Sequence, residues 1–198
     1  ENKFCKMTNL DWTLNSDEIR ETAGWSCASI LNDFEAVGYG VLAAEEEDLQ
    51  VIHQGKETKL VPKAPKVVLG PGTGFGQAQL FWNQKIETYT VMPSEGSHGD
   101  FAPRGLQQRG LLEFVERGKG YCELEHVCCG PGLENIHDYL VSSYASNDAS
   151  NGTRTNPTTN KSLSAPEIAS AALEGEDDLA HQSCHLLLSI LGQEAGNW

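Results

Sequence analysis

The sequence predicts a mixed α/β or α+β fold, in which strands and helices are interspersed along the chain. Three observations support this prediction. An apolar run leads directly into a glycine-rich segment, two segments of alternating polarity flank a short turn, and several helical stretches begin or end at capping residues. With 39% hydrophobic residues, the 198-residue chain can bury a core without disulfide bonds.

A strand and a helix are expected near the N-terminus. Residues 4–12 mix apolar and polar side chains and can include a short strand. Asn15, followed three residues later by Glu18, is a typical helix start, and Gly24 is a typical helix end. We therefore expect a helix between Asn15 and Gly24.

A second helix is expected after the apolar run of residues 27–31, and it begins close to Phe34. The acidic run of residues 45–48 is expected to be a solvated turn, which is the usual role of such a run. Two weak strand signals follow at residues 51–53 and 60–61.

The strongest strand signals lie in the middle of the chain. Residues 66–69 form an apolar run that leads into the glycine-rich segment 70–76. Residues 77–82 and 87–92 alternate in polarity around a turn at residues 83–84, and this pattern predicts a β-hairpin.

The remainder of the chain is predicted to be largely helical. Helices are expected at residues 105–117 and 133–144, at 166–173 after a proline in the first turn, and at 177–191. Residues 146–164 are rich in Asn, Thr and Ser, so we expect a surface loop or a disordered insert there.

The charge balance excludes several classes of partner. The 28 Asp and Glu residues outnumber 14 scattered Lys and Arg residues, for a formal net charge of −14. Nucleic acid and anionic membranes are therefore not expected as partners. The chain shows no apolar stretch of the ~20 residues that span a bilayer. Six cysteines without a disulfide-type spacing indicate free thiols and a cytoplasmic, reducing location.

The glycine-rich segment 70–76 has a glycine at every second position and Thr73 at its centre. Such a segment exposes backbone amides and lets a phosphate approach the main chain closely. It is not a Walker loop, because no Lys follows, and it is not a dinucleotide fingerprint, because Phe75 occupies the place of the third glycine. A tight surface turn is the alternative interpretation.

Asn32 and Asp33 follow the apolar run of residues 27–31. A carboxylate beside a carboxamide can bind a polyol and accept a proton from one of its hydroxyl groups. Alternatively, Asp33 caps the helix that begins at Phe34. The two roles can coexist.

Polar side chains alternate with small residues in the segment 93–101, where Glu95 and His98 stand out. Two such ligands make an incomplete metal site. A loop that forms hydrogen bonds with a hydroxyl-rich ligand is chemically more natural, because the carboxylate accepts and the imidazole either donates or accepts. A solvated turn remains the alternative.

Two further clusters contain metal-type side chains. The cysteines and the histidine within residues 122–129 lack the paired C-x₂-C spacing of a zinc site, and no metal is expected there. His181 and His185 share one face of a predicted helix with several leucines, which favours ordinary helix packing.

The order of these motifs resembles the bacterial-type glucokinases, within the hexokinase and actin-like ATPase superfamily. The resemblance is carried by an Asn-Asp segment, a G-x-GTG-x-G segment, a P-x-EG-x-H-x-DFAP segment, GPGL, and an early T-N-x-x-W. These occupy residues 30–40, 70–76, 93–103, 130–133 and 8–12.

The resemblance implies an actin-like, ribonuclease-H-like sugar-kinase fold with two lobes, incomplete in this chain. Residues 1–43 would belong to the small α/β lobe that carries the catalytic Asp, and residues 44–198 to the large α+β lobe. The implied activity is the phosphorylation of glucose at its C6 hydroxyl by ATP, with Mg²⁺ bridging the phosphates.

The resemblance also implies roles for individual residues. Asp33 matches the catalytic base of the family. Sugar contacts are implied for five residues: Asn32, Asp33, Glu95, His98 and Glu125. Phosphate contacts are implied for three residues of the glycine-rich segment: Gly72, Thr73 and Gly74.

The sequence departs from the family pattern in two respects. It contains no D-x-G-G-T phosphate loop and no glycine pair of an adenosine site after the last helix. We therefore expect either part of a longer protein or a truncated relative, and we expect these 198 residues alone to be insoluble or inactive. A non-catalytic sugar-binding relative, a kinase for another hexose or an aminosugar, and a structural fragment are the alternatives. The oligomeric state stays open, with a homodimer as one option.

Overall fold

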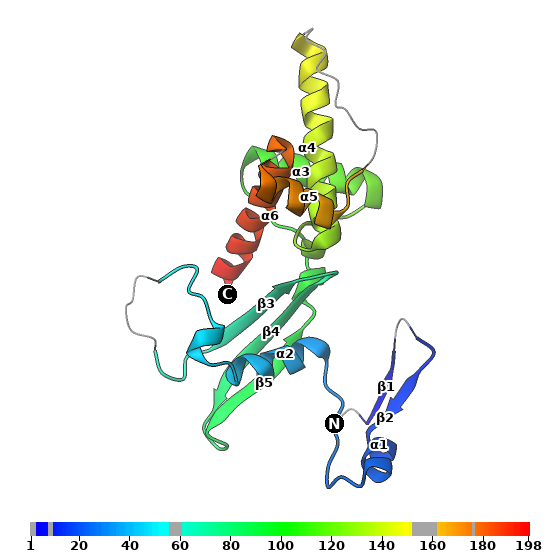
Figure 1. Ribbon diagram of the computed structural model, residues 1–198, viewed down its shortest axis with the longest axis vertical. Helices are drawn as coiled ribbons and strands as arrows, with labels where there is room; N and C mark the ends of the chain where they lie inside the picture. The colour runs from blue at the N-terminus through cyan, green and yellow to red at the C-terminus, as the bar shows by residue number, and fades with distance from the viewer. Residues whose placement is uncertain (1–2, 8–9, 56–60, 152–161, 176) are drawn as a thin grey trace. The chain divides into compact units, whose positions relative to one another are not determined.

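The computed structural model describes residues 3–7, 10–55, 61–151, 162–175 and 177–198, with only the backbone of residues 146–151 (Figure 1). The chain forms two compact units, Glu1–Pro62 and Lys63–Trp198. No helix in the described ranges is both long enough and apolar enough to cross a membrane.

The first unit begins with a two-stranded antiparallel sheet and a helix: β1 (Phe4–Lys6), β2 (Thr13–Asn15) and α1 (Ser16–Ala23). The side chain of Asn15 accepts a hydrogen bond from Asp17 N–H at 2.9 Å, so it caps α1 as predicted. Gly24 adopts a left-handed conformation with φ +66° and ends the helix, also as predicted.

The second helix of this unit is α2 (Asp33–Leu42), which begins where the sequence predicts. Its cap is Asn32, whose side-chain oxygen accepts hydrogen bonds from the backbone N–H groups of Phe34 at 2.9 Å and Glu35 at 3.2 Å. Asp33 is the first helical residue, and its carboxylate also accepts from Phe34 N–H at 2.8 Å. The principal capping role therefore belongs to Asn32.

The acidic run is solvent-exposed, as expected, but it forms a 3₁₀ turn, η1 (Glu46–Asp48). The weak strand signal at residues 51–53 was wrong, because these residues have no strand partner and remain exposed. At the other weak signal, Leu60 lies outside the described residues and Val61 is not in a strand.

The second unit contains an antiparallel sheet of order β3-β4-β5: β3 (Lys66–Pro71), β4 (Phe75–Asn83) and β5 (Thr88–Ser94). The predicted hairpin of β4 and β5 is therefore confirmed. The glycine-rich segment is mostly strand: Gly70 pairs with Gly76, and only Gly72, Thr73 and Gly74 form the turn between β3 and β4.

The helices of this unit gather at the end of the sheet where β3 turns into β4 (Figure 1). They are α3 (Gly105–Lys119), α4 (Gly130–Asn151), α5 (Ala165–Glu174) and α6 (Asp178–Asn197), with 3₁₀ turns η2 (Gly96–His98) and η3 (Leu124–Val127). Asp177 caps α6, and its carboxylate accepts from Leu179 N–H at 2.7 Å.

Two helices extend further than predicted. The backbone of α4 is helical to Asn151, so residues 146–151 are helical and not part of a loop as predicted; residues 152–161 of the predicted loop lie outside the described part. Similarly, α6 continues to Asn197. A helix anchored by packing along its first turns adds further residues at little cost, because propagation is easier than nucleation.

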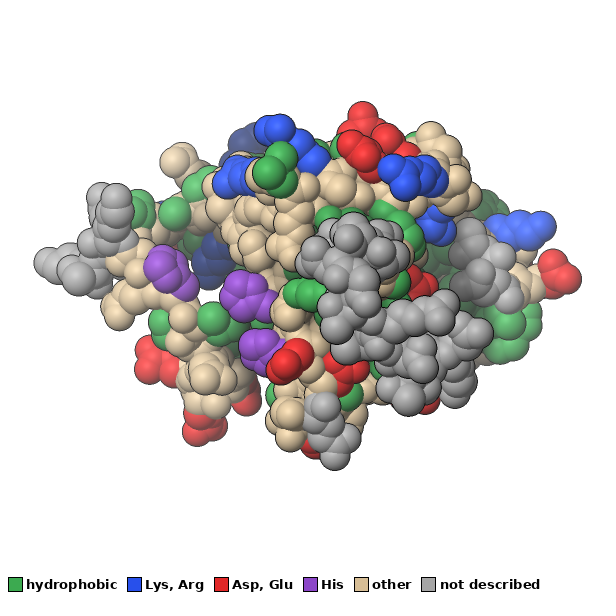
Figure 2. Space-filling view, turned by 90° about the horizontal axis from the view of Figure 1, so that it is seen from above, with side chains coloured by type: hydrophobic (Ala, Val, Ile, Leu, Met, Phe, Trp, Pro, Cys, Tyr) green, Lys and Arg blue, Asp and Glu red, His purple; other side chains and the backbone are tan. Residues whose placement is uncertain are grey.

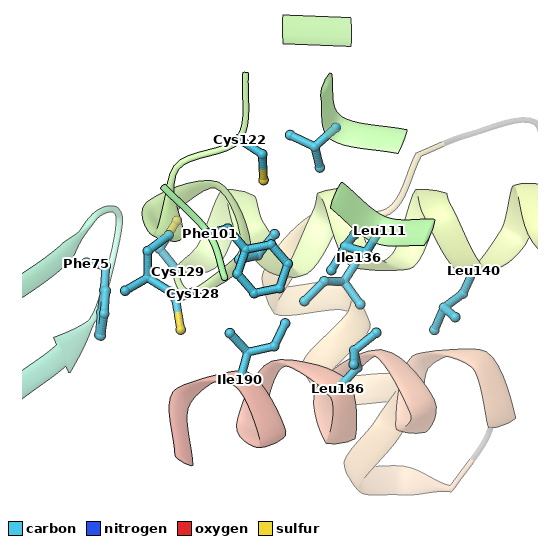
Figure 3. Close-up of a cluster of buried hydrophobic side chains, with 13 residues drawn as sticks. Phe75, Phe101, Leu111, Cys122, Cys128, Cys129, Ile136, Leu140, Leu186 and Ile190 are labelled. Atoms are coloured by element: carbon cyan, nitrogen blue, oxygen red, sulfur yellow. The ribbon is translucent and has the colours of Figure 1, made fainter. Parts of the chain in front are cut away.

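The core of the second unit is formed by apolar side chains from α3, α4 and α6 together with the segment that contains η3. Figure 3 shows Phe101 near its centre, with Ile136 of α4 and Ile190 of α6 facing it. Cys122 and Cys128 belong to this core, and burial raises the pKa of these thiols to about 11 and about 12. They act as small apolar side chains rather than as reactive thiolates.

The surface bears mixed charge. On the face shown in Figure 2, Lys and Arg side chains form small groups separated by acidic and neutral side chains. This arrangement agrees with the overall acidic composition and offers no broad basic area on that face among the described residues.

We predict that Gly132→Ala destabilises the protein by roughly 1–3 kcal/mol, because overpacking forces the backbone to move. A Cβ atom at Gly132 would lie 2.8 Å from the carbonyl carbon of Val127. The matched control is Gly118→Ala in the exposed part of α3, where a Cβ atom meets nothing within 4 Å. Chemical denaturation of the full-length protein measures both, and equal unfolding midpoints would contradict the prediction.

Candidate functional site

The turn between β3 and β4 is closed by main-chain hydrogen bonds. Gly72 N–H donates to Gly74 O at 2.8 Å, and Gly130 N–H at the start of α4 donates to Gly72 O at 2.8 Å. Thr73 lies exposed at the tip. The turn is thus held against the N-terminus of a long helix, where the partial positive charge favours an anion.

Glu125 in η3 contacts this turn from a position 50 residues further along the chain. Its carboxylate oxygen Oε2 accepts a hydrogen bond from Phe75 N–H at 2.8 Å. A Cβ atom at Gly74 would lie 2.7 Å from the same oxygen. A side chain at position 74 would therefore displace the carboxylate of Glu125 from its position beside Phe75 N–H.

A short main-chain pairing joins the segment that carries His98 to the segment that carries Glu125. An isolated antiparallel bridge pairs Asp100 with Glu123. Two main-chain hydrogen bonds of 2.9 Å flank it: Phe101 N–H to Cys122 O and Leu124 N–H to Gly99 O. These contacts fix η2 and η3 side by side.

His98 lies among carboxylates. Its Nδ1 is 2.9 Å from Oε2 of Glu123, and its Nε2 is 3.9 Å from Oε2 of Glu95. The hydrogen bond to Glu123 raises the pKa of His98, with smaller contributions from the negative charges of Glu125 and Glu95 and an opposing effect of partial burial.

Gln77 on β4 packs against the η2 segment. It is almost fully buried at 1% exposure and donates through Nε2 to Oε1 of Glu194 on α6 at 3.3 Å. Its Oε1 has no hydrogen-bond partner among the described residues, and a Cβ atom at Gly96 would collide with it. Gly96 is therefore the residue that allows η2 to pass over β4.

The cluster within residues 122–129 does not form a metal-type arrangement. Cys122, Cys128 and Cys129 are buried in the core cluster (Figure 3). His126 accepts at Nδ1 from Glu123 N–H at 3.2 Å, and burial lowers its pKa. Across the described residues, no three His, Cys, Asp or Glu side chains come together as they would around a metal ion.

His181 and His185 on α6 are exposed, rather than packed as expected. They line an apolar groove of about 400 Å³ with Leu133 of α4 and Leu173 of α5. This groove lies on the helical side of the unit and shares no residue with the predicted sugar and phosphate contacts.

The structure therefore brings together, within the second unit, the Gly72–Gly74 turn, Glu125, His98 and Glu95. Asn32 and Asp33 belong to the first unit, at the exposed start of α2. Sequence reasoning missed Glu123. Acidic and apolar residues alternate in the segment 122–126, and this pattern could have predicted that Glu123 and Glu125 face away from the core.

The whole chain, residues 1–198, matches the family model described as Glucokinase. The chain belongs to the glucokinase family. Curated relatives named glucokinase include one from Synechocystis sp., 36% identical over 98% of this chain and 56% of its own length. One from Nostoc sp. is 32% identical over 99% of this chain and 59% of its own length. The chain spans about half the length of the curated relatives it matches.

Solved structures of glucokinases share the fold. The glucokinase of an Antarctic psychrotroph superposes with a TM-score of 0.78 at 26% identity and covers 100% of this chain and 56% of its own. The glucokinase of Balamuthia mandrillaris in complex with glucose superposes with a TM-score of 0.60 at 26% identity, over 81% of this chain and 45% of its own. The predicted mixed fold class, with its actin-like sugar-kinase relationship, is confirmed.

We predict that Glu125→Ala destabilises the protein by about 1–3 kcal/mol, because the Phe75 N–H group loses its acceptor. The control is Glu113→Ala, since Glu113 is 66% exposed and forms only a surface ion pair with Arg117. Such a surface change is expected to alter stability by less than about 0.5 kcal/mol. Urea denaturation of the full-length protein compares the two. Equal losses would show that the hydrogen bond adds nothing to stability.

Proposed function

We propose that this chain carries the sugar-binding and catalytic part of a glucokinase that transfers a phosphoryl group from ATP to the C6 hydroxyl of glucose. One observation carries the proposal. Glu125, which matches a sugar-binding carboxylate of the family, accepts its hydrogen bond from Phe75, the residue that directly follows the Gly72–Gly74 turn. A sugar held by Glu125 would therefore lie beside the turn that matches the phosphate loop.

The groups gathered around His98 suit a neutral polyol. Glu95 and Glu125 supply carboxylate acceptors for sugar hydroxyl groups, and the imidazole of His98 supplies a further hydrogen-bonding atom. An epimer that misplaces one hydroxyl would leave one of these groups unpaired, at a cost of roughly 1–3 kcal/mol. The relative solved in complex with glucose supports this choice of substrate.

The turn of Gly72, Thr73 and Gly74 fits the phosphates of ATP. Two glycines leave room for a close approach, the Thr73 hydroxyl is exposed, and the N-terminus of α4 lies behind the turn. ATP would supply the phosphoryl group, and the Mg²⁺ bound with it would neutralise the negative charge that develops during transfer. The residues of the turn would bind and orient the phosphates.

Asp33 is proposed as the general base that accepts the proton of the C6 hydroxyl, a role that contributes roughly 10²–10⁴-fold to a rate. It is exposed at the first turn of α2. Asn32 is proposed as its sugar-binding neighbour. Because the Asn32 side-chain oxygen already caps α2, its amide group is the part available to donate to a sugar hydroxyl.

The assignment of residues 1–43 to the small lobe and residues 44–198 to the large lobe remains part of this proposal. It puts Asp33 and Asn32 on one lobe, and Glu95, His98 and Glu125 on the other. In a two-lobed kinase, closure over the sugar would bring these groups together and exclude water, which otherwise competes as the phosphoryl acceptor.

We predict that Asp33→Asn lowers kcat roughly 10²–10⁴-fold, while the Kd for glucose stays within a few fold. The change removes the proton acceptor and keeps the size of the side chain. Glu35→Gln is the matched control, because it removes one negative charge from the same helical turn. A coupled assay and calorimetry on the full-length protein measure turnover and binding.

Undiminished turnover in Asp33→Asn would remove Asp33 from its role. Glucose binding without any ATP-dependent turnover in the unmodified protein would instead indicate a non-catalytic sugar-binding relative. Faster turnover of another hexose or of an aminosugar, measured in the same assay across a sugar panel, would change the proposed substrate.

A further inference from the structure

We propose that Glu123 is a positioning residue of the sugar site, which holds the His98 ring with a proton on Nδ1 and presents Nε2 to the sugar. The inference rests on the proposed function, because it assigns Nε2 of His98 to a sugar hydroxyl. It adds a residue to which neither the sequence motifs nor the comparisons assign a role.

The chemistry of the two groups fixes the direction of the hydrogen bond between His98 and Glu123. Nδ1 of His98 lies 2.9 Å from Oε2 of Glu123. An ionised carboxylate only accepts hydrogen bonds, so Nδ1 carries the proton. Nε2 is then the lone-pair atom of the neutral ring. Its nearest carboxylate, that of Glu95, is 3.9 Å away, which is too far for a hydrogen bond.

Glu123 is held in place by the main-chain pairing of its segment. Its backbone takes part in the bridge to Asp100, and the neighbouring Leu124 N–H donates to Gly99 O at 2.9 Å. Its side chain is 22% exposed, compared with 52% for His98 and 79% for Glu95. The carboxylate is thus the better-held partner, and it orients a more exposed ring.

Glu123 forms hydrogen bonds of opposite direction with two histidines. Its backbone N–H donates to Nδ1 of His126 at 3.2 Å, so Nδ1 of that ring is an acceptor. Its side chain accepts from Nδ1 of His98. One residue therefore selects opposite tautomers for two neighbouring rings, and only His98 is left with Nε2 as its acceptor.

The charges that face His98 fix the direction of the pH effect. Glu95 directly precedes the 3₁₀ turn that carries His98, Glu123 and Glu125 lie beside and on η3, and His126 faces the same space. The hydrogen bond to Glu123 is the largest cause of the raised pKa of His98. Loss of the Glu123 charge therefore lowers this pKa, and the ring becomes neutral at lower pH.

The test compares Glu123→Gln and Glu123→Ala in the full-length protein, with histidines labelled for NMR and His98 assigned through His98→Asn. Glutamine keeps an acceptor for Nδ1–H, so the tautomer is retained while the titration midpoint of His98 moves to lower pH. Alanine removes the acceptor, so the Nδ1–H tautomer is lost as well. Glu113→Gln is the surface control.

Kinetics supply the second readout. The KM for glucose is expected to rise about 2–10-fold in Glu123→Ala, which corresponds to the loss of one ordinary hydrogen bond. The kcat of this variant is expected to stay within about twofold of the native value. The pH at which KM changes is expected to move down in Glu123→Gln together with the NMR midpoint of His98. A purely structural hydrogen bond would also set the tautomer of His98, but its loss would leave the KM for glucose and the pH dependence of KM unchanged.

The inference is overturned if the titration midpoint of His98 is the same in the native protein and in Glu123→Gln. It is also overturned if this midpoint moves while the KM for glucose and its pH dependence stay unchanged. If the native protein phosphorylates glucose and either result is obtained, only the role of Glu123 fails. If the native protein does not bind glucose, the proposed function fails together with the sugar role of His98.

Discussion

The hydrogen bond from Phe75 N–H to the carboxylate of Glu125 is the contact on which the site in the second unit depends. It joins the turn after β3 to the 3₁₀ turn η3, and a side chain at Gly74 would displace the carboxylate from this contact. Phe75 itself is buried in the core, so the donor is held by packing on one side and the acceptor by η3 on the other. A rigid donor and a rigid acceptor are what a preorganised site requires.

The core behind the site determines which side chains face outward. Cys122, Leu124 and Val127 are buried, and this packing turns Glu123 and Glu125 toward η2 and the glycine turn. Apolar packing thereby concentrates several carboxylates around one imidazole. Such a group of acceptors suits the hydroxyl groups of a neutral sugar and repels anions, so the proposed phosphate contacts would depend on backbone amides, a helix N-terminus and a bound cation.

Much of the local structure could be predicted from sequence, because its causes are local. The Asn15 cap, the left-handed Gly24 and the hairpin of alternating polarity each depend on residues within a few positions of one another. The ordered motifs were also sufficient to indicate the glucokinase family. The lengths of α4 and α6 were underestimated, since packing along the first turns extends a helix beyond its local propensity.

By itself, the sequence determined the fold class, the family and the types of residue that the site contains. Only the tertiary structure decided that Asn32 is the main cap of α2, that Glu125 approaches Gly74, and that the carboxylate of Glu123 lies within hydrogen-bond distance of His98. The last two contacts join residues 51 and 25 positions apart in sequence. They exist because the bridge between Asp100 and Glu123 aligns two segments, and no local propensity encodes such a pairing.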